Sequence, residues 1–448
     1  MKAAGKGAPL RVGIAGLGTV GGGTLRALAD NAEAIGLRCG RPVRAVAVSA
    51  RDRHKERGLD LSACRWHDDP LALAADPEVE VVVELIGGSD GPAKALVEAA
   101  LEAGKPVVTA NKALLAHHGT ALARLAEARD AGLYYEAAVA GGIPVIGLLR
   151  DGLAGNRVER VAGILNGTCN YILTTMRESG REFADVLAEA QALGYAEADP
   201  GFDIDGVDAA HKLAILTALA FGCTLDFEAV RVEGIRQISA VDIAFAEELG
   251  LRIKLLGIAA RNGGGGGPGG GDGGGEATVS QRVAPVMVPL GSPLAAVEGV
   301  FNAVLAEGDF VGKIMAEGAG AGERPTASAV VADLAAIARG DRRAVFGVPA
   351  AALRRLAAAP VEDQAGAWYL RLMVIDQPGV IAEVAAALRD EEISVEALLQ
   401  RGRDPGELVP VVITTHETSE GRMRRAVARI AALEACLEAP RLIRIESE

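Results

Sequence analysis

Arg11-Val-Gly-Ile-Ala15 leads directly into Gly16-Leu17-Gly18-Thr19-Val20-Gly21, so a strand-like run ends in a glycine-rich turn, and a helical pattern follows. The first glycine suits a tight turn, the second lets a pyrophosphate approach the backbone, and the third lets helix and strand pack closely. The free N–H groups at the helix start also attract phosphate. Because the turn joins a strand to a helix at the start of an alternating pattern, it predicts a dinucleotide-binding site rather than a glycine turn without a ligand.

The turn opens a first half in which short β-branched runs alternate with helical stretches. The expected strands are Arg11–Ala15, Val43–Ser49, Val79–Leu85, Lys105–Thr109 and Leu133–Glu136. Strands that alternate with helices imply a parallel sheet covered on both faces. We therefore predict an α/β fold with a Rossmann-type, doubly wound parallel sheet.

Longer helical segments follow from Val158, and two β-like runs, Lys254–Ala260 and Thr278–Val288, flank the nearly pure glycine stretch 262–275. These features predict an α+β catalytic and dimerisation unit, in which the glycine stretch is a disordered loop inserted in a hairpin. Ala350–Ala359 is expected to be a helical linker. The remaining segments have the βαββαβ order of a ferredoxin-like fold. The expected units are 1–142 (completed by 318–345), 143–325 and 367–448, with a linker at 346–366.

Composition excludes several classes of partner. The 448 residues are 50% hydrophobic and carry 46 Lys and Arg against 59 Asp and Glu, a net charge of −13. Such a balance argues against nucleic acid or an anionic membrane as partner, and no apolar run reaches the ~18 residues of a membrane span. The 5 cysteines form no C-x-x-C pair, which argues against a disulfide framework or a zinc ribbon. We expect a cytoplasmic protein.

The end of the second expected strand bears on the choice of nucleotide. Ser49-Ala50-Arg51-Asp52-Arg53 has no acid at the strand end, where a carboxylate would hold a ribose 2′-hydroxyl. Small residues followed by Arg51 suit a 2′-phosphate instead, so NADP(H) is favoured, with NAD(H) as the second choice. The alternative is that these arginines form only a solvated loop.

Two lysine-containing segments indicate chemistry. Lys112 follows an apolar strand, at the edge where open α/β sheets bind ligands. Further along, Tyr195–Lys212 concentrates carboxylates, and Asp208 and Lys212 stand four residues apart on one helical face, so they can form an ion pair. A lysine beside carboxylates at the border of an apolar helix suits proton transfer. The alternative is a solvated or calcium-type acidic loop, although the spacing of an EF-hand is missing. His211 is expected to face outward or pack without a chemical role.

Taken together, these features resemble the homoserine dehydrogenase family, in its long form with a C-terminal ACT domain. The most specific matching segment is Leu193–Leu213; the others, in the family's order, are Gly16–Gly21, Gly104–Leu115, Tyr135–Val145, Ile164–Ile172, Phe301–Gly312 and Gly318–Leu334. The resemblance implies reversible, NAD(P)-dependent interconversion of L-aspartate 4-semialdehyde and L-homoserine. This is the branch-point step toward threonine, methionine and isoleucine.

The resemblance also implies roles for residues. Lys212 would be the proton donor and acceptor at the reacting oxygen, with Lys112 beside the nicotinamide and the substrate, and Asp208, which can pair with Lys212, would be the third catalytic residue. The implied substrate contacts are Asn166, Gly167, Thr168, Tyr195, Glu197, Asp203, Asp208 and Lys212, and the implied cofactor contacts are Gly16, Leu17, Gly18, Thr19, Val20, Gly21, Arg51, Lys112 and Gly322. Glu136, Val139, Gly141 and Ile143 match a site for a monovalent cation, usually sodium, formed mainly by backbone oxygens.

The C-terminal unit would be regulatory on the same resemblance. Asp376, Gly379 and Val380 match the effector loop of an ACT domain, which implies binding of an amino acid, in the first place L-threonine, and inhibition. A purely structural or dimerising unit is the alternative. ACT units pair sheet edge to edge, so a homo-oligomer, dimer or tetramer, is expected. Two other functions stay open: a different semialdehyde or amino-acid dehydrogenase, and a regulatory amino-acid-binding protein with a vestigial nucleotide site, against which the intact glycine turn and both lysines argue.

Overall fold

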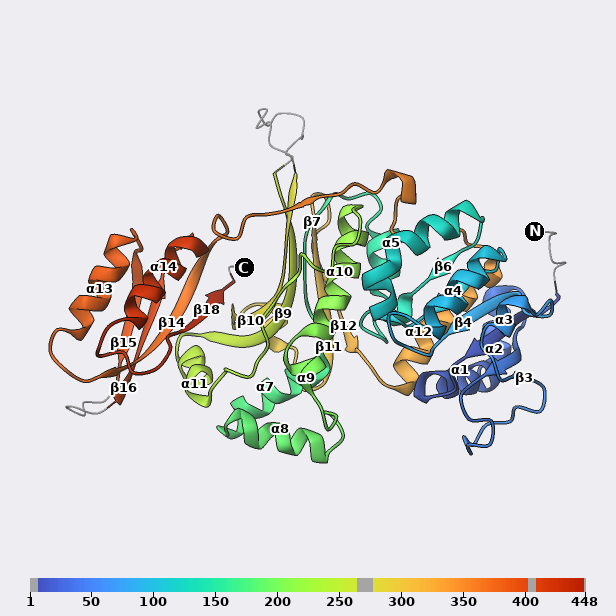
Figure 1. Ribbon diagram of the computed structural model, residues 1–448, viewed down its shortest axis with the longest axis horizontal. Helices are drawn as coiled ribbons and strands as arrows, with labels where there is room; N and C mark the ends of the chain where they lie inside the picture. Colours follow the sequence, from blue (N-terminus) through green and yellow to red (C-terminus); the bar gives the residue numbers. More distant parts are fainter. Residues whose placement is uncertain (1–6, 264–276, 402–407, 447–448) are drawn as a thin grey trace.

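The computed structural model describes residues 7–263, 277–401 and 408–446, and the chain forms three units in a row (Figure 1). The first unit, blue to cyan in the figure, contains the amino terminus; the second, green to yellow, contains a long hairpin; the third is orange to red. Most of the expected glycine-rich loop 262–275 lies outside the described residues. Among the described helices, none combines the length and the apolar character needed to cross a membrane.

The first unit is built on a six-stranded parallel sheet, sheet A, in the order β3-β2-β1-β4-β5-β6. The chain starts at the centre and changes direction between β1 and β4, which confirms the predicted doubly wound arrangement. The strands are β1 (Leu10–Ala15), β2 (Val43–Ser49), β3 (Arg65–His67), β4 (Val81–Glu84), β5 (Val107–Thr109) and β6 (Leu133–Tyr134); the helices are α1 (Thr19–Asp30), α2 (Ala32–Cys39), α3 (Ala72–Ala75), α4 (Pro92–Glu102) and α5 (Lys112–Ala128). The sequence pattern does not predict β3 or α2.

Helices on both faces explain why the strands of sheet A are nearly continuous apolar runs. The central strand β4 is buried at every position. A late helix, α12 (Glu323–Arg339), completes one face by packing against α1 and α2. Arg26 of α1 pairs with Glu323 of α12 across 297 residues of sequence, and a Cβ at Gly23 would lie 2.6 Å from Glu323 Cγ. The helix that follows the second unit therefore returns to the first.

The second unit carries the hairpin β9 (Leu251–Asn262) and β10 (Thr278–Pro289) at the centre of a mixed sheet, sheet B. Its antiparallel register confirms the hairpin predicted around the glycine stretch. The other elements are β7 (Val158–Ile164), β8 (Arg231–Val232), β11 (Phe301–Gly308), β12 (Gly312–Ala319), α6 (Val145–Gly147), α7 (Gly167–Ser179), α8 (Phe183–Ala192), α9 (Gly201–Ile204), α10 (Val207–Phe221) and α11 (Ala240–Glu248), with 3-10 turns at η1 (Glu136–Ala138) and η3 (Pro293–Ala296) and a π-helical turn at η2 (Leu148–Gly152). The almost wholly buried α10 lies between sheet B and α5 of the first unit.

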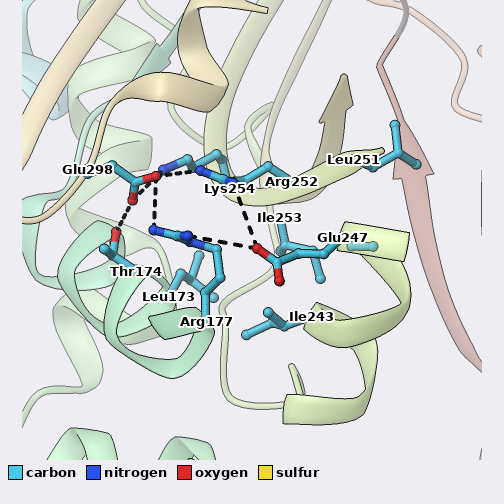
Figure 2. A pocket seen from close by; sticks show the side chains of 11 residues that line it. Leu173, Thr174, Arg177, Ile243, Glu247, Leu251, Arg252, Ile253, Lys254 and Glu298 are labelled. Carbon is cyan, nitrogen blue, oxygen red and sulfur yellow. Dashed lines mark hydrogen bonds and ion pairs between the residues drawn. The ribbon is translucent and has the colours of Figure 1, made fainter. Parts of the chain in front are cut away.

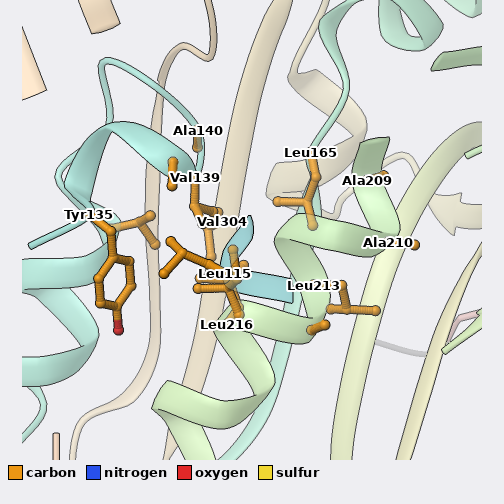
Figure 3. Packing of buried hydrophobic residues seen from close by; sticks show 14 of the residues in the cluster. Leu115, Tyr135, Val139, Ala140, Leu165, Ala209, Ala210, Leu213, Leu216 and Val304 are labelled. Carbon is orange, nitrogen blue, oxygen red and sulfur yellow. The ribbon is translucent and has the colours of Figure 1, made fainter. Parts of the chain in front are cut away.

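One hydrophobic cluster runs through the junction of these two units (Figure 3). Leu115 of α5 gathers there with Tyr135 and Val139 from beyond β6 and with Leu213 and Leu216 of α10, and all five are fully buried. Full burial of each such side chain stabilises by about 1.5–3 kcal/mol. The junction is therefore part of the core, and it fixes the start of α10 relative to α5.

The third unit has the strand order β18-β14-β16-β15, with α13 and α14 packed on the sheet, which confirms the predicted ferredoxin-like fold. Its elements are β14 (Ala365–Ile375), α13 (Val380–Asp390), β15 (Val395–Gln400), β16 (Leu408–Thr415), β17 (Thr418–Ser419), α14 (Glu420–Ala431) and β18 (Arg441–Ile445). β18 also pairs in parallel with β10, Val286 with Arg444 and Met287 with Ile445. Sheet B therefore runs without a break from the second unit into the third.

The expected helix at Ala350–Ala359 is wrong. Apart from the 3-10 turn η4 (Ala350–Ala352) the stretch is not helical, and β13 (Ala357–Ala358) pairs with Thr278 and Val279 of β10. Prolines bracket this short stretch, and a helix of this length is marginal without tertiary support. The hydrogen bonds that β10 offers therefore outweigh the helix propensity of alanine.

Candidate active site

The carboxyl ends of β4 and β5 bring Lys112 to the same edge of sheet A as the glycine turn that follows β1. A polar network fixes this edge. Thr109 Oγ1 donates to Glu84 Oε2 at 2.6 Å, and Asn111 caps α5 by accepting from the Leu114 N–H at 3.0 Å. Lys112 is the first residue of α5, so it starts from a rigid position.

Lys112 and Lys212 share one carboxylate, that of Asp208. Lys112 Nζ lies 2.9 Å from Asp208 Oδ1, and Lys212 Nζ lies 2.8 Å from Asp208 Oδ2. Lys212 also donates to the Leu165 carbonyl at 2.6 Å. Burial by itself would raise the pKa of Asp208, but the two lysines hold it well below its usual value. The predicted ion pair within α10 is confirmed, and the first unit adds a second lysine to it.

A second carboxylate, Asp203, is joined to the first by Asn166. Asn166 Nδ2 donates to Asp203 Oδ1 and to Asp208 Oδ2, at 2.8 Å each, while its Oδ1 caps α7 by accepting from the Cys169 N–H. Within the described chain no lysine or arginine pairs with Asp203, and burial together with repulsion from Asp208 raises its pKa. The site therefore holds one neutralised carboxylate and one that lacks a cation.

The other predicted substrate residues lie around this pair. Thr168 Oγ1 donates to the Tyr195 carbonyl at 2.8 Å and lies 3.3 Å from Asp203 Oδ2. Gly167 is the first residue of α7, directly after Asn166. Glu197 is exposed, and among the described residues its carboxylate forms no hydrogen bond or ion pair with the others. The structure thus brings together all the predicted substrate residues except the Glu197 carboxylate.

The glycine turn has the shape that a dinucleotide requires. Gly16 has φ +95°, and a Cβ there would lie 2.3 Å from the Leu85 carbonyl oxygen. A Cβ at Gly21 would lie 2.0 Å from the Gly16 oxygen, so neither position admits a side chain. Gly18, by contrast, faces open space at the start of α1. The open backbone at a helix N-terminus fits a pyrophosphate.

A loop after β2 flanks this turn. Arg51 is exposed, as a reader of a 2′-phosphate must be. Arg57, which the sequence reasoning missed, donates to the Leu17 carbonyl at 3.3 Å (Nε) and to the Asp52 carbonyl at 2.6 Å (Nη2). Its only sequence signal is membership of the basic run 51–57. Arg57 therefore brings a second guanidinium to the glycine turn.

Gly322, the late cofactor contact expected from the sequence, precedes α12. It has φ +109°, and the helix that it opens packs on α1. The chain therefore returns to the nucleotide-binding face at this residue.

His211 is buried beside the lysines rather than exposed. Its ring centroid lies 4.5 Å from that of Phe227 and 5.4 Å from that of His117 on α5. Burial lowers its pKa to about 4, so the ring is neutral at physiological pH. Of the two predicted possibilities, packing is confirmed.

The expected cation-binding stretch 136–143 forms a buried turn between the first two units. The predicted residues Glu136, Val139, Gly141 and Ile143 are all buried. Ala140 (φ +54°) and Gly141 (φ +33°) are left-handed, while the Glu136 carboxylate accepts two backbone N–H groups of α6 at 2.8 and 2.9 Å. In the described parts of the chain, no group of three His, Cys, Asp or Glu side chains is placed to hold a metal. The four residues expected around a cation therefore lie together in one buried turn.

The expected effector residues lie between the end of β14 and the first residue of α13. Gly379 precedes α13 with φ +102°, and nothing lies within 4 Å of the position of a Cβ there. Val380 is buried in the core of the third unit. Asp376 follows β14 directly. The loop thus ends in open space at the N-terminus of α13.

A parallel sheet with a dinucleotide turn at its carboxyl edge, and a lysine at that same edge paired with a carboxylate of the second unit, defines an NAD(P)-dependent oxidoreductase. The chain matches the homoserine dehydrogenase family over residues 144–335, the NAD-binding domain of homoserine dehydrogenase over residues 16–136, and the ACT domain over residues 368–435. The chain belongs to the homoserine dehydrogenase family, whose members act on a CH–OH group.

Individual relatives agree along the whole chain. Homoserine dehydrogenase of Neisseria gonorrhoeae is 46% identical over 446 residues, which cover 98% of this chain and 99% of that protein. Homoserine dehydrogenase of Pseudomonas aeruginosa is 46% identical over 435 residues, or 95% and 96% of the two chains. The crystal structure of a homoserine dehydrogenase from Thiobacillus denitrificans, 45% identical, matches with a TM-score of 0.90 over 99% of both chains.

Proposed function

We propose that this protein catalyses the reversible, NAD(P)H-dependent reduction of L-aspartate 4-semialdehyde to L-homoserine, and so serves the synthesis of threonine, methionine and isoleucine. The observation that carries the proposal is the shared carboxylate. Lys112 and Lys212, from two units, meet on Asp208 at 2.9 and 2.8 Å, at the ligand-binding edge of sheet A. Two ammonium groups are thereby held where a carbonyl oxygen would be reduced.

In this scheme Lys212 donates a proton to the aldehyde oxygen during reduction and accepts it back during oxidation. Reduction of an aldehyde leaves negative charge on its oxygen, and a protonated lysine beside that oxygen supplies both a counter-charge and a proton. NADPH supplies the hydride when it is bound. Asp208 stays ionised, because the pKa of its carboxyl is held low, and its hydrogen bond with Lys212 orients the ammonium group. Lys112, on the nucleotide side of the same carboxylate, adds a second positive charge.

Asp203 accounts for recognition of the amino acid. The substrate carries an α-ammonium group, and Asp203 is the half-buried carboxylate of the site with no lysine or arginine paired to it in the described chain. Asn166 and Thr168 hold that carboxylate in place, and Gly167, Tyr195 and the exposed Glu197 would complete the pocket. A substrate ammonium would also lower the raised pKa of Asp203.

We propose NADP(H) as the preferred cofactor. The end of β2 has no carboxylate to repel a 2′-phosphate, while Arg51 is exposed and Arg57 touches the glycine turn. A solved hyperthermophilic archaeal homoserine dehydrogenase mutant in complex with NADPH is 26% identical to this chain and matches 73% of it with a TM-score of 0.61. That protein's ligand supports the choice.

Cation binding, regulation and assembly complete the proposal. Sodium would be bound by backbone oxygens of Glu136, Val139, Gly141 and Ile143, in the turn between the first two units. L-threonine would bind at Asp376, Gly379 and Val380 and inhibit the enzyme, and the chain would work as a homo-oligomer.

The proposed units of the chain are 1–142 with 318–345, 143–325 and 367–448, joined by the linker 346–366. A cytoplasmic location agrees with its five unpaired cysteines.

The decisive assay follows the absorbance of NADPH formed from NADP and L-homoserine, with NAD and with added L-threonine as the other arms. We expect reduction of NADP, faster than that of NAD at equal concentration, and inhibition by threonine. Turnover that threonine does not inhibit would support the proposed enzymatic activity and contradict the role of threonine as effector. No turnover of L-homoserine with either nucleotide would refute the proposed function.

A further inference from the structure

A cluster of charged side chains lies at the second half of α7, the helix whose first turn belongs to the active site. Thr174 and Arg177 of α7, Arg252 and Lys254 of β9 and Glu298 from the loop before β11 form what we call the Glu298 cluster (Figure 2). Thr174 Oγ1 donates to Glu298 Oε2 at 2.9 Å, Arg177 Nη2 lies 3.2 Å from Oε1, and Lys254 Nζ lies 3.7 Å from Oε2. Arg252 binds the same carboxylate. Glu298 therefore ties α7 to β9.

Lys254 extends the cluster toward the active site. Its side chain is 1% exposed, and Nζ donates to Asn170 Oδ1 at 3.2 Å and to the Val297 carbonyl. Asn170 lies in the first turn of α7, and its N–H donates to the Asn166 carbonyl at 3.2 Å. Asn166 is the residue whose single amide group holds both Asp203 and Asp208. The position of these carboxylates thus depends on where the first turn of α7 is held.

The opposite end of the cluster leads to the ACT unit through α11. Glu247 of α11 lies 3.8 Å from both Arg177 and Arg252. At the other end of α11, Asp242 is fully buried and accepts from Arg371 Nε at 2.7 Å and from Tyr369 Oη at 3.1 Å, both on β14. β14 is the first strand of the ACT unit, which therefore holds Asp242 near the start of α11. At the other end of the helix, Glu247 contacts the arginines of the Glu298 cluster, and Glu248 pairs with Arg401 of the ACT unit.

We propose that the Glu298 cluster positions α7 for catalysis, and that α11 transmits changes in the ACT unit to it. Glu298 and Lys254 are then positioning residues for the substrate carboxylates, and Asp242, Arg371 and Tyr369 form the contact through which the ACT unit acts. This inference rests on the proposed function, because it assigns a route to the regulation of that site. Every link in the route is a direct contact between named side chains or along one helix.

Stability alone does not explain such a cluster. Buried and half-buried ion pairs often contribute little to folding, because desolvation offsets their attraction. Three cations, Arg177, Arg252 and Lys254, surround Glu298 and Glu247. The buried ammonium group of Lys254 also donates to an amide and a carbonyl, so the cluster loses more hydration than an apolar filling of the same space would. What the arrangement does provide is direction: it fixes where α7 lies relative to β9 and α11.

The test compares Glu298→Gln with Glu80→Gln in the full chain. Glu80 pairs with Arg11 and Arg41 at 3.3 and 3.5 Å, and its side chain is 31% exposed against 33% for Glu298, so it is a matched control in the first unit. We expect Glu298→Gln to raise the KM for L-homoserine about tenfold with the KM for NADP unchanged, and Glu80→Gln to change neither. Tenfold lies within the ~0.5–2 kcal/mol range of known couplings between sites. A homoserine KM within twofold of wild type, or equal rises for both substrates, would overturn the proposal.

A gentler variant and the ACT contact complete the test. Thr174→Val leaves the ion pairs of Glu298 in place but removes a hydroxyl that donates to Glu298 and accepts from the Gly299 N–H at 3.2 Å. It takes the place of Glu298→Gln, with the same sign expected, should that variant not fold. Tyr369→Phe removes one hydrogen bond from Asp242 and is expected to raise the homoserine KM about threefold, again without effect on NADP. An unchanged homoserine KM in Tyr369→Phe would show that the ACT unit does not act through Asp242. Absence of homoserine turnover in the wild type would instead show failure of the proposed function itself.

Discussion

Replacement of Lys212 by methionine tests the proposed proton transfer most directly. Methionine keeps most of the apolar length of the side chain but removes the ammonium group. In the structure that group donates to Asp208 at 2.8 Å and to the Leu165 carbonyl at 2.6 Å. The variant therefore loses the proton donor and one of the two cations on a buried carboxylate.

The two losses differ in size. A positioned acid or base typically contributes about 10²- to 10⁴-fold to the rate, so kcat should fall by that factor. For stability, an uncompensated buried charge would cost about 3–5 kcal/mol. Asp208 keeps Lys112 at 2.9 Å and the Asn166 amide at 2.8 Å, so we expect only about 1–3 kcal/mol. The folded variant should remain the dominant species.

The assay measures kcat with saturating L-homoserine and NADP, NADPH affinity by fluorescence titration, and the free energy of unfolding in urea. Lys94→Met is the control, because Lys94 lies on α4, outside the site, and faces Glu98 at 3.9 Å on the surface. The expected pattern is a large loss of kcat, NADPH affinity within about threefold, and an unchanged control. Turnover near the wild-type value would refute the role of Lys212, and a parallel loss of NADPH affinity would mean that the residue is structural.

Three further predictions follow from the site. Arg51→Ala should weaken NADPH several-fold more than NADH in fluorescence titration, because only the former carries a 2′-phosphate; equal effects would show that the loop does not read it. Because burial and Asp208 raise the pKa of Asp203, the KM for homoserine should rise as the pH falls, starting above the pH at which an ordinary aspartate is protonated. Asp203→Asn should have a high KM at every pH, and a KM profile unchanged by this substitution would contradict the role. Since ionisation of a carboxyl with a raised pKa costs stability as the pH increases, the melting temperature of Asp203→Asn at pH 7 should be no lower than that of the wild type. Gly21→Ala places a Cβ 2.0 Å from the Gly16 oxygen and should abolish NADPH binding in calorimetry, whereas Gly18→Ala, with open space around it, should fold normally; intact binding by Gly21→Ala would show that the turn is not the nucleotide site.

Local patterns in the sequence foretold much of this molecule. The glycine turn fixes its own geometry, because Gly16 needs a positive φ and Gly21 needs the absence of a side chain, and both needs are visible in the sequence. The spacing of Asp208 and Lys212 likewise implies a helical ion pair, since residues four apart share a helix face. Such features depend on neighbours in sequence, so they can be predicted.

Features that depend on distant partners could not be predicted from the residues. The contact between Lys112 and Asp208 requires α5 and α10 to pack, which no local pattern states. Asn166 gains its role from two carboxylates 37 and 42 residues away, and its place in the site came from the family resemblance. The stretch Ala350–Ala359 shows the same limit from the other side: its helix propensity yields to pairing with β10.

The carboxylate of Asp208 belongs to the second unit, but one of its two cations, Lys112, belongs to the first. The nucleotide side and the substrate side of the enzyme therefore share a single charge. A nucleotide that changes the charge balance at Asp208 therefore changes the affinity for substrate, and thermodynamic linkage requires that substrate changes the affinity for nucleotide by the same factor. An inhibitor designed for the homoserine pocket of this protein will accordingly bind with an affinity that depends on which form of the nucleotide is already in place.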